Sequence, residues 1–377
     1  MYIWQHTDWP GFTFNFNELK PHLEAVRLQQ NKLLGQSKES TKDLDVEAQM
    51  DALIQNAIRT SEIEGEKLNV ESVRSSVARH LGIQKAGMRG GTEQTDALVG
   101  MLLDATQELE SPLSETRLCQ WQSQLFPEGP GLMNPVKVGE LRGDAPMQVV
   151  SGTIEKPIVH FEAPPGDRLK PELEAFINWF NKPPEDLDEL IRAGIAHLWL
   201  VTLHPFDDGN GRITRAVTDR ALAQAEHNSI RFYSLSAAIM ERRKEYYEQL
   251  ERTQKGDLDI TPWLTWFLNV LEDALKQGQL RLNRVMKKSR FWLRHSQTPL
   301  IERQIKVLNR LLDVGAAQEG AEGFEHGINA KKYASLTKTS KPTATRDLTD
   351  LLKKGCLIKL PGGGRSTRYA INYGDTP

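Results

Sequence analysis

The chain has 377 residues, with 48 Lys and Arg against 50 Asp and Glu and a net charge of -2. This length predicts two or three domains, and the near-zero charge argues against binding nucleic acid over the whole surface. The two cysteines, Cys119 and Cys356, exclude a disulfide framework and a cysteine-rich zinc site, and favour a cytoplasmic protein. No apolar run approaches the ~20 residues of a membrane span and the N-terminus lacks a signal-peptide pattern, so we expect no membrane partner.

The charge is unevenly distributed. Residues 286–377 carry 17 Lys and Arg against 8 Asp and Glu, a net charge of +9, which leaves -11 for residues 1–285. An acidic body with a basic C-terminal part indicates two modules with different roles. Drift in surface charge would give the same numbers, so charge alone leaves the question open.

Helices are predicted over most of residues 1–285. An aromatic arm opens the chain, and the apolar spacing predicts helices at about 17–34 and over 44–81, interrupted at Gly65. Between Pro127 and Pro171 the helical spacing is lost. Short strands are predicted there at 136–138, 148–150 and 158–161, typical of a hairpin-bearing loop region. Helices resume at 172–180, 186–203, 213–225, 237–254 and 261–279.

The basic C-terminal part has its own pattern. It predicts helices at 301–312, 330–336 and 341–354, then strands at 357–360 and 367–371 joined by a glycine-rich turn. This order is typical of a winged helix-turn-helix, an α+β module. Thr343, Thr345 and Arg346 would begin its recognition helix, and Lys359, Arg365 and Arg368 would contact phosphates. DNA is therefore an expected partner of residues 330–371, and a protein-interaction module is the open alternative.

One segment carries the chemistry, His204-Pro-Phe-Asp-Asp-Gly-Asn-Gly-Arg-Ile-Thr-Arg215, between two predicted helices. Gly209 and Gly211 flank Asn210, so successive backbone N–H groups can face one concavity. That concavity lies at a helix N-terminus, where phosphate is favoured.

Four side chains of the segment suit phosphate chemistry. Arg212 and Arg215 are three residues apart on the first helical turn and can reach the same polyphosphate. Asp208 is an oxygen ligand suited to Mg²⁺ bridging phosphates, and His204 is a base for an incoming hydroxyl. A calcium loop would need different residues at its fifth and sixth positions, a transition-metal site would need a third ligand, and no Walker motif occurs. The segment predicts phosphoryl or nucleotidyl transfer.

The same segment resembles the signature of the Fic (Fic/Doc) family, H-x-F-x-[DE]-G-N-G-R-x-x-R, at every defined position. The resemblance implies a mainly α fold, with a helical Fic core and a short β-hairpin flap. It also implies transfer of AMP from ATP and Mg²⁺ to a Ser, Thr or Tyr hydroxyl of a target protein.

The resemblance also implies a role for each residue of the signature. His204 would be the general base and Asp208 the Mg²⁺ ligand. The phosphates would be bound by Gly209, Asn210 and Gly211 (α and β), by Arg212 (β) and by Arg215 (γ).

A second segment, Thr60-Ser-Glu-Ile-Glu64-Gly65, resembles the family's inhibitory motif, [ST]-x-x-x-E-[GN]. The resemblance implies that Glu64 pairs with Arg215. Arg215 then cannot hold the γ-phosphate, and ATP binds in an unproductive pose. Since this motif precedes the signature, the chain resembles the class with an N-terminal inhibitory helix. Taken alone, the motif is weak and is most typical of an ordinary helix end with a solvated Glu.

The strand-like region resembles the family's flap, which clamps a target segment through backbone hydrogen bonds. Val150, Ser151 and Gly152 are predicted to form its nucleotide-facing tip. Tyr246, Tyr247 and Gln254 resemble the adenine-side residues of relatives, although Asn is commoner at the position of Gln254. The two tyrosines fit equally well as core aromatics of a helix.

The predicted organisation has four parts: an N-terminal arm and helix (1–40), an inhibitory-helix region (41–100), a Fic core (101–285, flap about 136–165) and a winged helix-turn-helix (286–377). The predicted function is a cytoplasmic protein adenylyltransferase that uses ATP and Mg²⁺, modifies a target protein or itself, and forms a homodimer. Two alternatives stay open. One is removal of AMP from a modified protein, with Glu64 orienting a water. The other is a DNA-binding regulator whose Fic site senses nucleotide.

Overall fold

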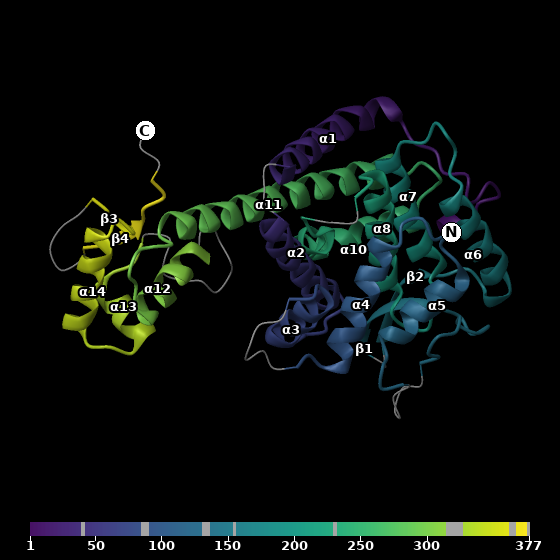
Figure 1. Ribbon diagram of the computed structural model, residues 1–377. Coiled ribbons are helices and arrows are strands. Elements are labelled where there is room, and N and C mark those ends of the chain that lie inside the picture. The colour runs from purple at the N-terminus through teal and green to yellow at the C-terminus, as the bar shows by residue number, and fades with distance from the viewer. Residues whose placement is uncertain are drawn as a thin grey trace. The chain divides into compact units, whose positions relative to one another are not determined.

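The computed structural model describes residues 1–38, 42–83, 90–129, 136–153, 156–228, 232–313, 327–361 and 367–374. The described residues are mainly helical, with two small antiparallel sheets, β1–β2 and β3–β4 (Figure 1). The prediction of a mainly α fold with a short hairpin is confirmed. The chain divides into two compact units, one of Met1–Glu39 and Asp45–Gln279 and one of Ser40–Leu44 and Leu280–Pro377.

The first unit contains the elements that build the site. In chain order they are η1 (Ile3–Gln5), α1 (Phe16–Lys38), α2 (Lys42–Ile63), α3 (Val70–His80), α4 (Glu93–Gln107), α5 (Glu115–Gln124), β1 (Gln148–Thr153), β2 (Lys156–Glu162), α6 (Gly166–Asn181), α7 (Glu189–Leu203), α8 (Asn210–Ala225), α9 (Leu235–Glu241), α10 (Arg243–Gln254) and α11 (Thr261–Arg294). The boundary between the two units falls within α11.

The helix predicted at 237–254 is divided into α9 and α10, because Arg242 leaves the helical conformation with φ -116°. Three further predictions from the sequence differ from this structure. The predicted strand at 136–138 is absent from the described residues, because its backbone bonds to side chains: Lys137 N–H donates to Asp207 Oδ2 at 3.1 Å, and Lys137 O accepts from Gln122 Nε2 at 3.0 Å. Helices α4 and α5 were not predicted, although Thr92 and Ser114 cap their N-termini.

The third difference is the length of α11, which continues to Arg294 rather than ending near Gln279. Gly278 did not break this helix. A Cβ there would lie 2.8 Å from Phe232 O and from Tyr233 Cβ, so glycine permits a close approach of the chain. Tertiary packing therefore offsets the helix penalty of glycine, which is ~1 kcal/mol.

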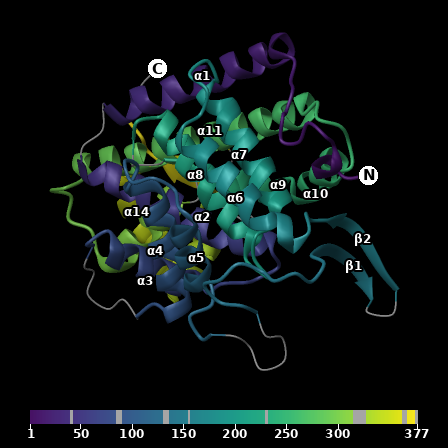
Figure 2. The ribbon, with the colours of Figure 1, turned by 90° about the vertical axis from the view of Figure 1, so that its right-hand side faces the viewer.

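Helices α7 and α8 form the centre of this unit. Every residue of α7 from Leu190 to Leu203 is buried, which accounts for its nearly continuous apolar sequence. Figure 2 shows α6, α7 and α8 together and the β1–β2 hairpin extending beside them. Trp263 of α11 donates Nε1–H to Gly194 O of α7 at 2.8 Å. The two helices meet closely because a Cβ at Gly194 would lie 2.7 Å from Leu264 Cδ2.

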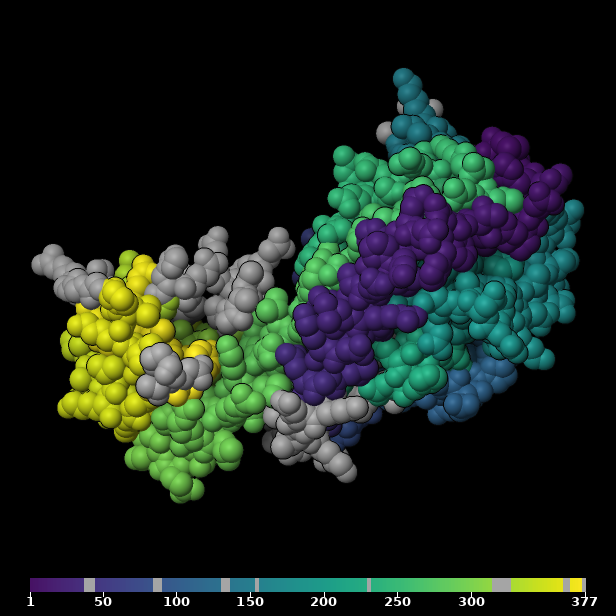
Figure 3. Space-filling view, turned by 90° about the horizontal axis from the view of Figure 1, so that it is seen from above, coloured from purple at the N-terminus to yellow at the C-terminus, as the bar shows by residue number. Residues whose placement is uncertain are grey.

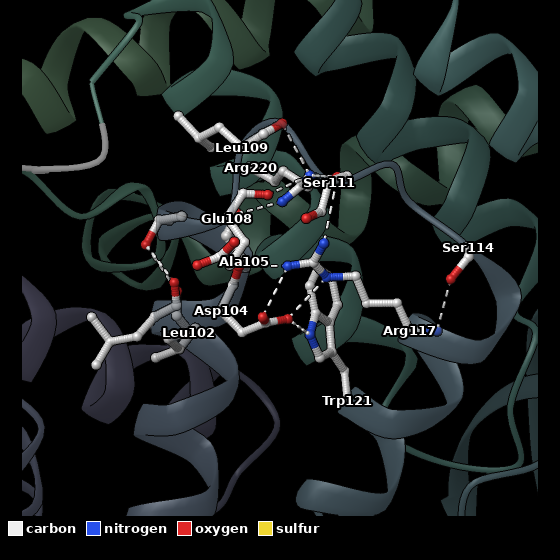
Figure 4. Close-up of polar contacts among 12 residues, drawn as sticks. Leu102, Asp104, Ala105, Glu108, Leu109, Ser111, Ser114, Arg117, Trp121 and Arg220 are labelled. Atoms are coloured by element: carbon white, nitrogen blue, oxygen red, sulfur yellow. Dashed lines mark hydrogen bonds and ion pairs between the residues drawn. The ribbon is translucent and has the colours of Figure 1, made fainter.

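A polar network fixes the far half of α8. Arg220 donates to the carbonyl oxygens of Ala105, Glu108, Leu109 and Ser111 at and beyond the C-terminus of α4, where a cation is favoured (Figure 4). Burial lowers the pKa of Arg220 to about 10, which leaves the side chain charged at neutral pH.

A neighbouring network joins α4 to α5. Arg117 donates to both carboxylate oxygens of Asp104 at 2.9 Å, and Trp121 donates its Nε1–H to the same carboxylate at 2.6 Å (Figure 4). Burial alone would raise the pKa of Asp104, but these donors lower it, so the carboxylate is ionised. Helix α4 is thus tied to both α5 and α8.

The N-terminal arm packs on the core rather than extending away from it. Trp9 and Phe12 meet Trp199 of α7 edge to face, with ring centroids 6.3 and 5.9 Å apart. Trp4 donates its Nε1–H to Glu162 O at the end of β2, at 2.7 Å. Figure 3 shows the N-terminal segment, in purple, lying over the green and teal core.

The second unit contains α12 (Glu302–Asp313), α13 (Ala330–Thr337), α14 (Lys341–Lys353), β3 (Leu357–Lys359) and β4 (Tyr369–Ile371). Its buried polar centre is Asp347, which accepts from Arg303 at 2.6 Å and from Tyr333 OH at 3.0 Å. The elements follow the predicted order, and the winged-helix assignment stays a prediction. Arg365 lies outside the described residues. Among the described helices, none is both long and apolar enough to cross a membrane.

Candidate active site

A cavity of about 810 Å³ lies in the first unit, within the usual size range of small-molecule sites. Most residues predicted for the nucleotide site line it: Glu64, Val150, Ser151, His204, Asp208, Gly209, Asn210, Gly211, Tyr246, Tyr247 and Gln254. The predicted residues Gly152, Arg212 and Arg215 lie outside this lining. The sequence analysis did not single out His160, Arg243 and Glu251, which also line the cavity.

His204 ends α7 in the left-handed conformation, with φ 49° and ψ 59°. Its Nδ1 lies 2.9 Å from Val201 O. Because a carbonyl oxygen only accepts, Nδ1 carries the hydrogen, and Nε2 of the neutral ring keeps its lone pair. Burial lowers the pKa of His204, with Arg142 acting in the same direction and the Val201 bond, Glu64 and Asp208 opposing. The neutral ring can therefore accept a proton near neutral pH.

Arg142, which the sequence analysis did not single out, joins His204 to the hairpin. It is 6% exposed, and its Nε donates to His204 O at 2.8 Å. Its Nη2 donates to Pro164 O, just beyond β2, at 2.5 Å, and its backbone N–H donates to Pro205 O at 3.0 Å. These bonds hold the backbone of His204 in its unusual conformation and place a cation at the C-terminus of α7.

The N-terminus of α8 borders the same cavity. Gly209 precedes the helix with φ 89°, a conformation that favours glycine. The side chain of Asn210 accepts from Phe206 N–H at 2.9 Å and donates to Phe206 O at 2.7 Å, which clamps the loop. The first i→i−4 bond of the helix is from Ile213 N–H to Gly209 O, so the preceding N–H groups form an anion-binding helix end.

Arg215 is 2% exposed and is held by the end of α2. Its Nη2 lies 2.8 Å from Glu64 Oε1 and donates to Thr60 O at 2.8 Å, while Nε donates to Thr60 Oγ1 at 2.8 Å. Burial alone would lower the pKa of Arg215, but the Glu64 carboxylate outweighs it and raises that pKa. Within the described residues, Nη1 is buried without a hydrogen-bond partner and is thus a donor available to an anion.

Arg212 has a second carboxylate partner that the sequence analysis missed. Its Nη1 donates to Glu66 Oε2 at 2.9 Å, and its guanidinium lies 5.6 Å from the centroid of the Phe126 ring. Gly65, with φ 86°, reverses the chain between Glu64 and Glu66, so both carboxylates reach α8. Two carboxylates from one turn therefore hold both signature arginines.

Gly211 lets the Glu64 carboxylate approach the helix end. A Cβ at this position would lie 2.1 Å from Glu64 Oε1 and 3.1 Å from Arg215 Nη1. An anion thus already lies against the first turn of α8, where a phosphate group would bind.

Asp208 fits a magnesium site that is completed by phosphates. Its side chain is 57% exposed and lines the cavity, and its Oδ1 accepts from Gly209 N–H at 2.5 Å. The described residues hold no group of three or more His, Cys, Asp or Glu suited to a metal. Mg²⁺ commonly binds through one or two carboxylates, substrate phosphates and waters, which this donor set would allow.

Another part of the cavity wall comes from β1 and β2. The strands pair from Gln148↔Glu162 to Thr153↔Lys156, with a register shift between Val149 and Val150. Val150 is 54% exposed and Ile158 59%, so the hairpin presents apolar side chains without covering them. Gly152 adopts φ 91° close to the hairpin turn, where a Cβ would lie 2.6 Å from Lys156 O. The geometry of the hairpin turn therefore explains why residue 152 is a glycine.

Tyr246 belongs to the core as well as to the cavity wall. Thr218 Oγ1 donates to Thr214 O at 2.7 Å, so it accepts from His197 Nδ1–H at 2.9 Å. His197 Nε2 then accepts from Tyr246 OH, also at 2.9 Å. Burial, helped by the charge of Arg215, lowers the pKa of His197 to about 3, which keeps this chain of hydrogen bonds neutral.

The other two residues predicted for the adenine side have different contacts. Tyr247 is 36% exposed, and its hydroxyl donates to Ile63 O at the end of α2 at 3.1 Å. Gln254 is buried and donates to Thr202 Oγ1 at 3.2 Å. Both line the cavity, and their role on the adenine side stays a prediction.

The fold and the site define a helical domain in which the imidazole of His204 and the N-terminus of α8 line one cavity. Residues 112–222 match the Fic/DOC family, and residues 2–83 match a domain of unknown function, DUF4172. The chain thus contains a Fic/DOC domain. The DUF4172 segment supplies Thr60, Glu64 and Glu66 to the site of that domain.

Curated relatives share part of the chain. Protein adenylyltransferase Fic of Nematostella vectensis is 35% identical over 115 residues, which are 30% of this chain and 25% of that protein. Protein adenylyltransferase Fic of Drosophila grimshawi is 25% identical over 236 residues, which are 60% of this chain and 43% of that protein. The chain thus spans less than half the length of these relatives.

Solved structures share the fold. A Fic family protein from Desulfovibrio desulfuricans G20 has a TM-score of 0.51 at 18% identity, covering 93% of this chain and 96% of that one. A Fic-domain signaling protein from Bacteroides thetaiotaomicron VPI-5482 has a TM-score of 0.50 at 17% identity, covering 71% of this chain and 96% of that one.

Proposed function

We propose that this chain is a protein adenylyltransferase, which transfers AMP from ATP to a hydroxyl of a protein. The observation that carries the proposal is the pairing of Arg215 with Glu64 against the first turn of α8, where Glu64 and the neutral ring of His204 line the same cavity. An anion site beside a base is what nucleotidyl transfer to a hydroxyl requires. The names of the curated relatives agree with this reaction.

In this mechanism Nε2 of His204 takes the proton of the acceptor hydroxyl, whose oxygen attacks the α-phosphorus of ATP. The bond to the bridging oxygen of the β-phosphate breaks, and pyrophosphate leaves with that electron pair. The N-terminus of α8, Arg212 and Arg215 stabilise the charge on the phosphates. Asp208 would hold Mg²⁺, which would neutralise phosphate charge, and the hairpin would pair with the backbone of the target segment.

Glu64 inhibits this reaction in our proposal. Its carboxylate occupies the approach to α8 and holds Nη2 of Arg215, so a γ-phosphate would meet a negative charge and a guanidinium already in use. The DUF4172 segment, which carries Glu64, is then the regulatory part of the chain.

The test is labelling with ATP carrying ³²P in the α position, or in the γ position as control. The chain with Glu64→Gly is incubated with Mg²⁺ and a protein extract, and the label is compared with that of the extract alone. We expect the chain to add label to extract proteins from α-labelled ATP and not from γ-labelled ATP. Adding His204→Ala should lower that label by ~10²–10⁴-fold, the usual contribution of a general base. Undiminished label would contradict the assignment of His204, and label from γ-labelled ATP would indicate a kinase.

The reverse reaction uses the same cavity and is tested in the same way. Proteins that carry label after the first incubation are purified and returned to unlabelled chain. Release of AMP by wild type, but not by Glu64→Gly, would assign Glu64 to orienting a water. If neither variant releases AMP, the forward reaction alone is supported.

We also propose that the second unit binds DNA, because Thr345 and Arg346 on α14 are exposed while Asp347 on the same helix is buried and paired. A helix with one buried and one basic polar face suits a duplex groove. Binding of duplex DNA that weakens steeply with salt and is lost in Arg346→Ala would support this. Salt-independent binding, or none, would favour a protein partner. The homodimer and cytoplasmic location stay predictions.

A further inference from the structure

Three side chains on the hairpin side of the cavity form a chain of hydrogen bonds. Ser151 comes from β1, His160 from β2 and Glu251 from α10. Ser151 Oγ lies 2.6 Å from His160 Nε2, and His160 Nδ1 lies 2.9 Å from Glu251 Oε2. All three line the cavity that holds His204 and the N-terminus of α8.

The direction of these bonds follows from the acceptor at one end. The Glu251 pKa is lowered, chiefly by the hydrogen bond from Lys255 and also by His160, so the carboxylate is ionised and only accepts. His160 Nδ1 therefore carries a hydrogen, and in the neutral ring Nε2 accepts from the Ser151 hydroxyl. A hydroxyl, a base and a carboxylate that orients the base are the parts of an activated nucleophile.

The backbone of the hairpin explains how His160 comes to face Ser151. Val150 pairs with Val159 and Val149 pairs with Phe161, so His160 is the extra residue of a β-bulge. Bulges redirect a side chain and are frequent beside active sites. Side chains alternate between the two faces along a regular strand. Without the extra residue of the bulge, the imidazole of His160 would therefore lie on the other face of the hairpin.

We propose that Ser151 is a site of self-modification, which accepts AMP from ATP bound in this cavity with His160 as its base. This inference rests on the proposed function, since the AMP donor is the same ATP. The hydroxyl proton passes to His160 Nε2 as Ser151 Oγ attacks the α-phosphorus. A Ser151–phosphorus ester bond forms, the bond to the β-phosphate oxygen breaks, and pyrophosphate leaves. The imidazolium, paired with Glu251, then returns its proton to solvent.

Self-modification at this residue would act on the flap itself. Ser151 lies within the strand pair that is proposed to hold the target segment. An AMP group there adds a charged phosphodiester and a bulky nucleoside to an exposed strand. We expect it to exclude the target, so that modification of the flap limits further transfer.

The test maps AMP on the full chain. The Glu64→Gly chain is incubated with ATP, Mg²⁺ and protein extract, and AMP on its peptides is quantified by mass spectrometry, beside α-³²P label on the extract proteins in the same tube. We expect AMP on the peptide that contains Ser151 and none at that site in Ser151→Ala. Ser123→Ala is the matched control, because the Ser123 hydroxyl donates to Gln120 O and Ser123 lies outside the cavity lining. It should leave both signals unchanged.

Two further variants separate the bases. His160→Gln should lower AMP on Ser151 at least ~10-fold more than it lowers label on extract proteins, the low end of general-base effects. His204→Ala should do the opposite. Labelled extract with unmodified Ser151, or equal loss at both sites in His160→Gln, would overturn the inference and leave the proposed function standing. Absence of AMP on both the chain and the extract would overturn both.

Discussion

The two walls of the cavity are held in different ways. On the α7–α8 side, side chains are buried and bonded to backbone: Asn210 clamps Phe206, and Arg142 holds His204. On the hairpin side, the side chains are more exposed and bond mainly to one another, as in the link from Ser151 to His160. The first wall is suited to fixing phosphates in one geometry, and the second to receiving a variable protein segment.

The contrast predicts which kinetic parameter a substitution in each wall changes most. Changes on the α7–α8 side should alter the chemical step or ATP binding, because its groups are preorganised. Changes on the hairpin side should alter the KM for protein acceptors more than kcat. Measurements of kcat and KM for AMP transfer in the Glu64→Gly background therefore test this difference between the two walls.

After His204→Ala, the largest effect is expected at the helix end that is proposed to bind phosphate. Gly211→Ala places a methyl group where the Glu64 carboxylate now lies, and a phosphate that binds there would clash with it. In the Glu64→Gly background we expect kcat/KM for ATP to fall ~10²–10³-fold, as for loss of one oxyanion donor. Gly100→Ala in α4 is the control, since its Cβ would make only ordinary contact with His80. Unchanged kinetics in Gly211→Ala would place the phosphates elsewhere.

The next effect is at the residue that joins the two walls. Arg142→Met removes the donors to His204 O and Pro164 O, and hydrogen bonds from charged groups contribute ~1.5–3 kcal/mol each. We expect kcat to fall ~10–100-fold by the transition-state relation. The loss of a nearby cation should also raise the pKa of His204, because Arg142 opposes the carboxylates of Glu64 and Asp208, which raise it.

The pH profile of kcat/KM is a second measurement for the Arg142→Met prediction. The base must be neutral to act, so a higher pKa moves the acid limb of the kcat/KM profile to higher pH. Arg142→Lys keeps the charge but not the forked donors. It should restore the pH profile more than it restores kcat. A fall in rate with an unmoved acid limb in Arg142→Met would indicate a purely structural role.

How much of this was predictable differs between the walls. The residues from His204 to Arg215 are contiguous, so their types and spacing are enough to indicate phosphate chemistry. The pairing of Glu64 with Arg215 followed from the resemblance. The Glu66 partner of Arg212 did not, although its place one residue past Gly65 was a usable signal.

The hairpin wall was predictable only in outline. Strands at 148–150 and 158–161 were expected and are present within β1 and β2. The contact of His160 with Glu251 joins residues 91 apart and depends on a bulge, which no local pattern specifies. The role of Arg142 was likewise hidden, because its acceptors are backbone carbonyls that any sequence would supply.

A smaller effect, of opposite sign, is expected for the inhibitory contact. Glu64→Gly frees Nη2 of Arg215 and clears the first turn of α8. A gain of one to two kcal/mol corresponds to a factor of about 5–30 in the population able to bind ATP productively. The rate of AMP transfer at low ATP measures it. Glu62→Gly is the control, because Glu62 lies in the last turn of α2, two residues before Glu64, and pairs with Arg59 instead. An equal gain from both variants would assign the effect to a weakened α2.

The smallest effect is expected from the contact between the N-terminal arm and the end of β2. Trp4→Phe removes the Nε1–H donor to Glu162 O at the end of β2, while keeping an aromatic ring against Phe161 and Ala163. One lost neutral hydrogen bond costs ~1 kcal/mol, and we expect the KM for protein acceptors to rise by roughly five-fold, with kcat nearly unchanged. Trp9→Phe is the control, because it loses an indole hydrogen bond to the Glu172 side chain on α6 and none to the hairpin backbone. If Trp4→Phe lowered kcat instead, the hairpin would belong to the preorganised part of the site, and the two walls would act as one.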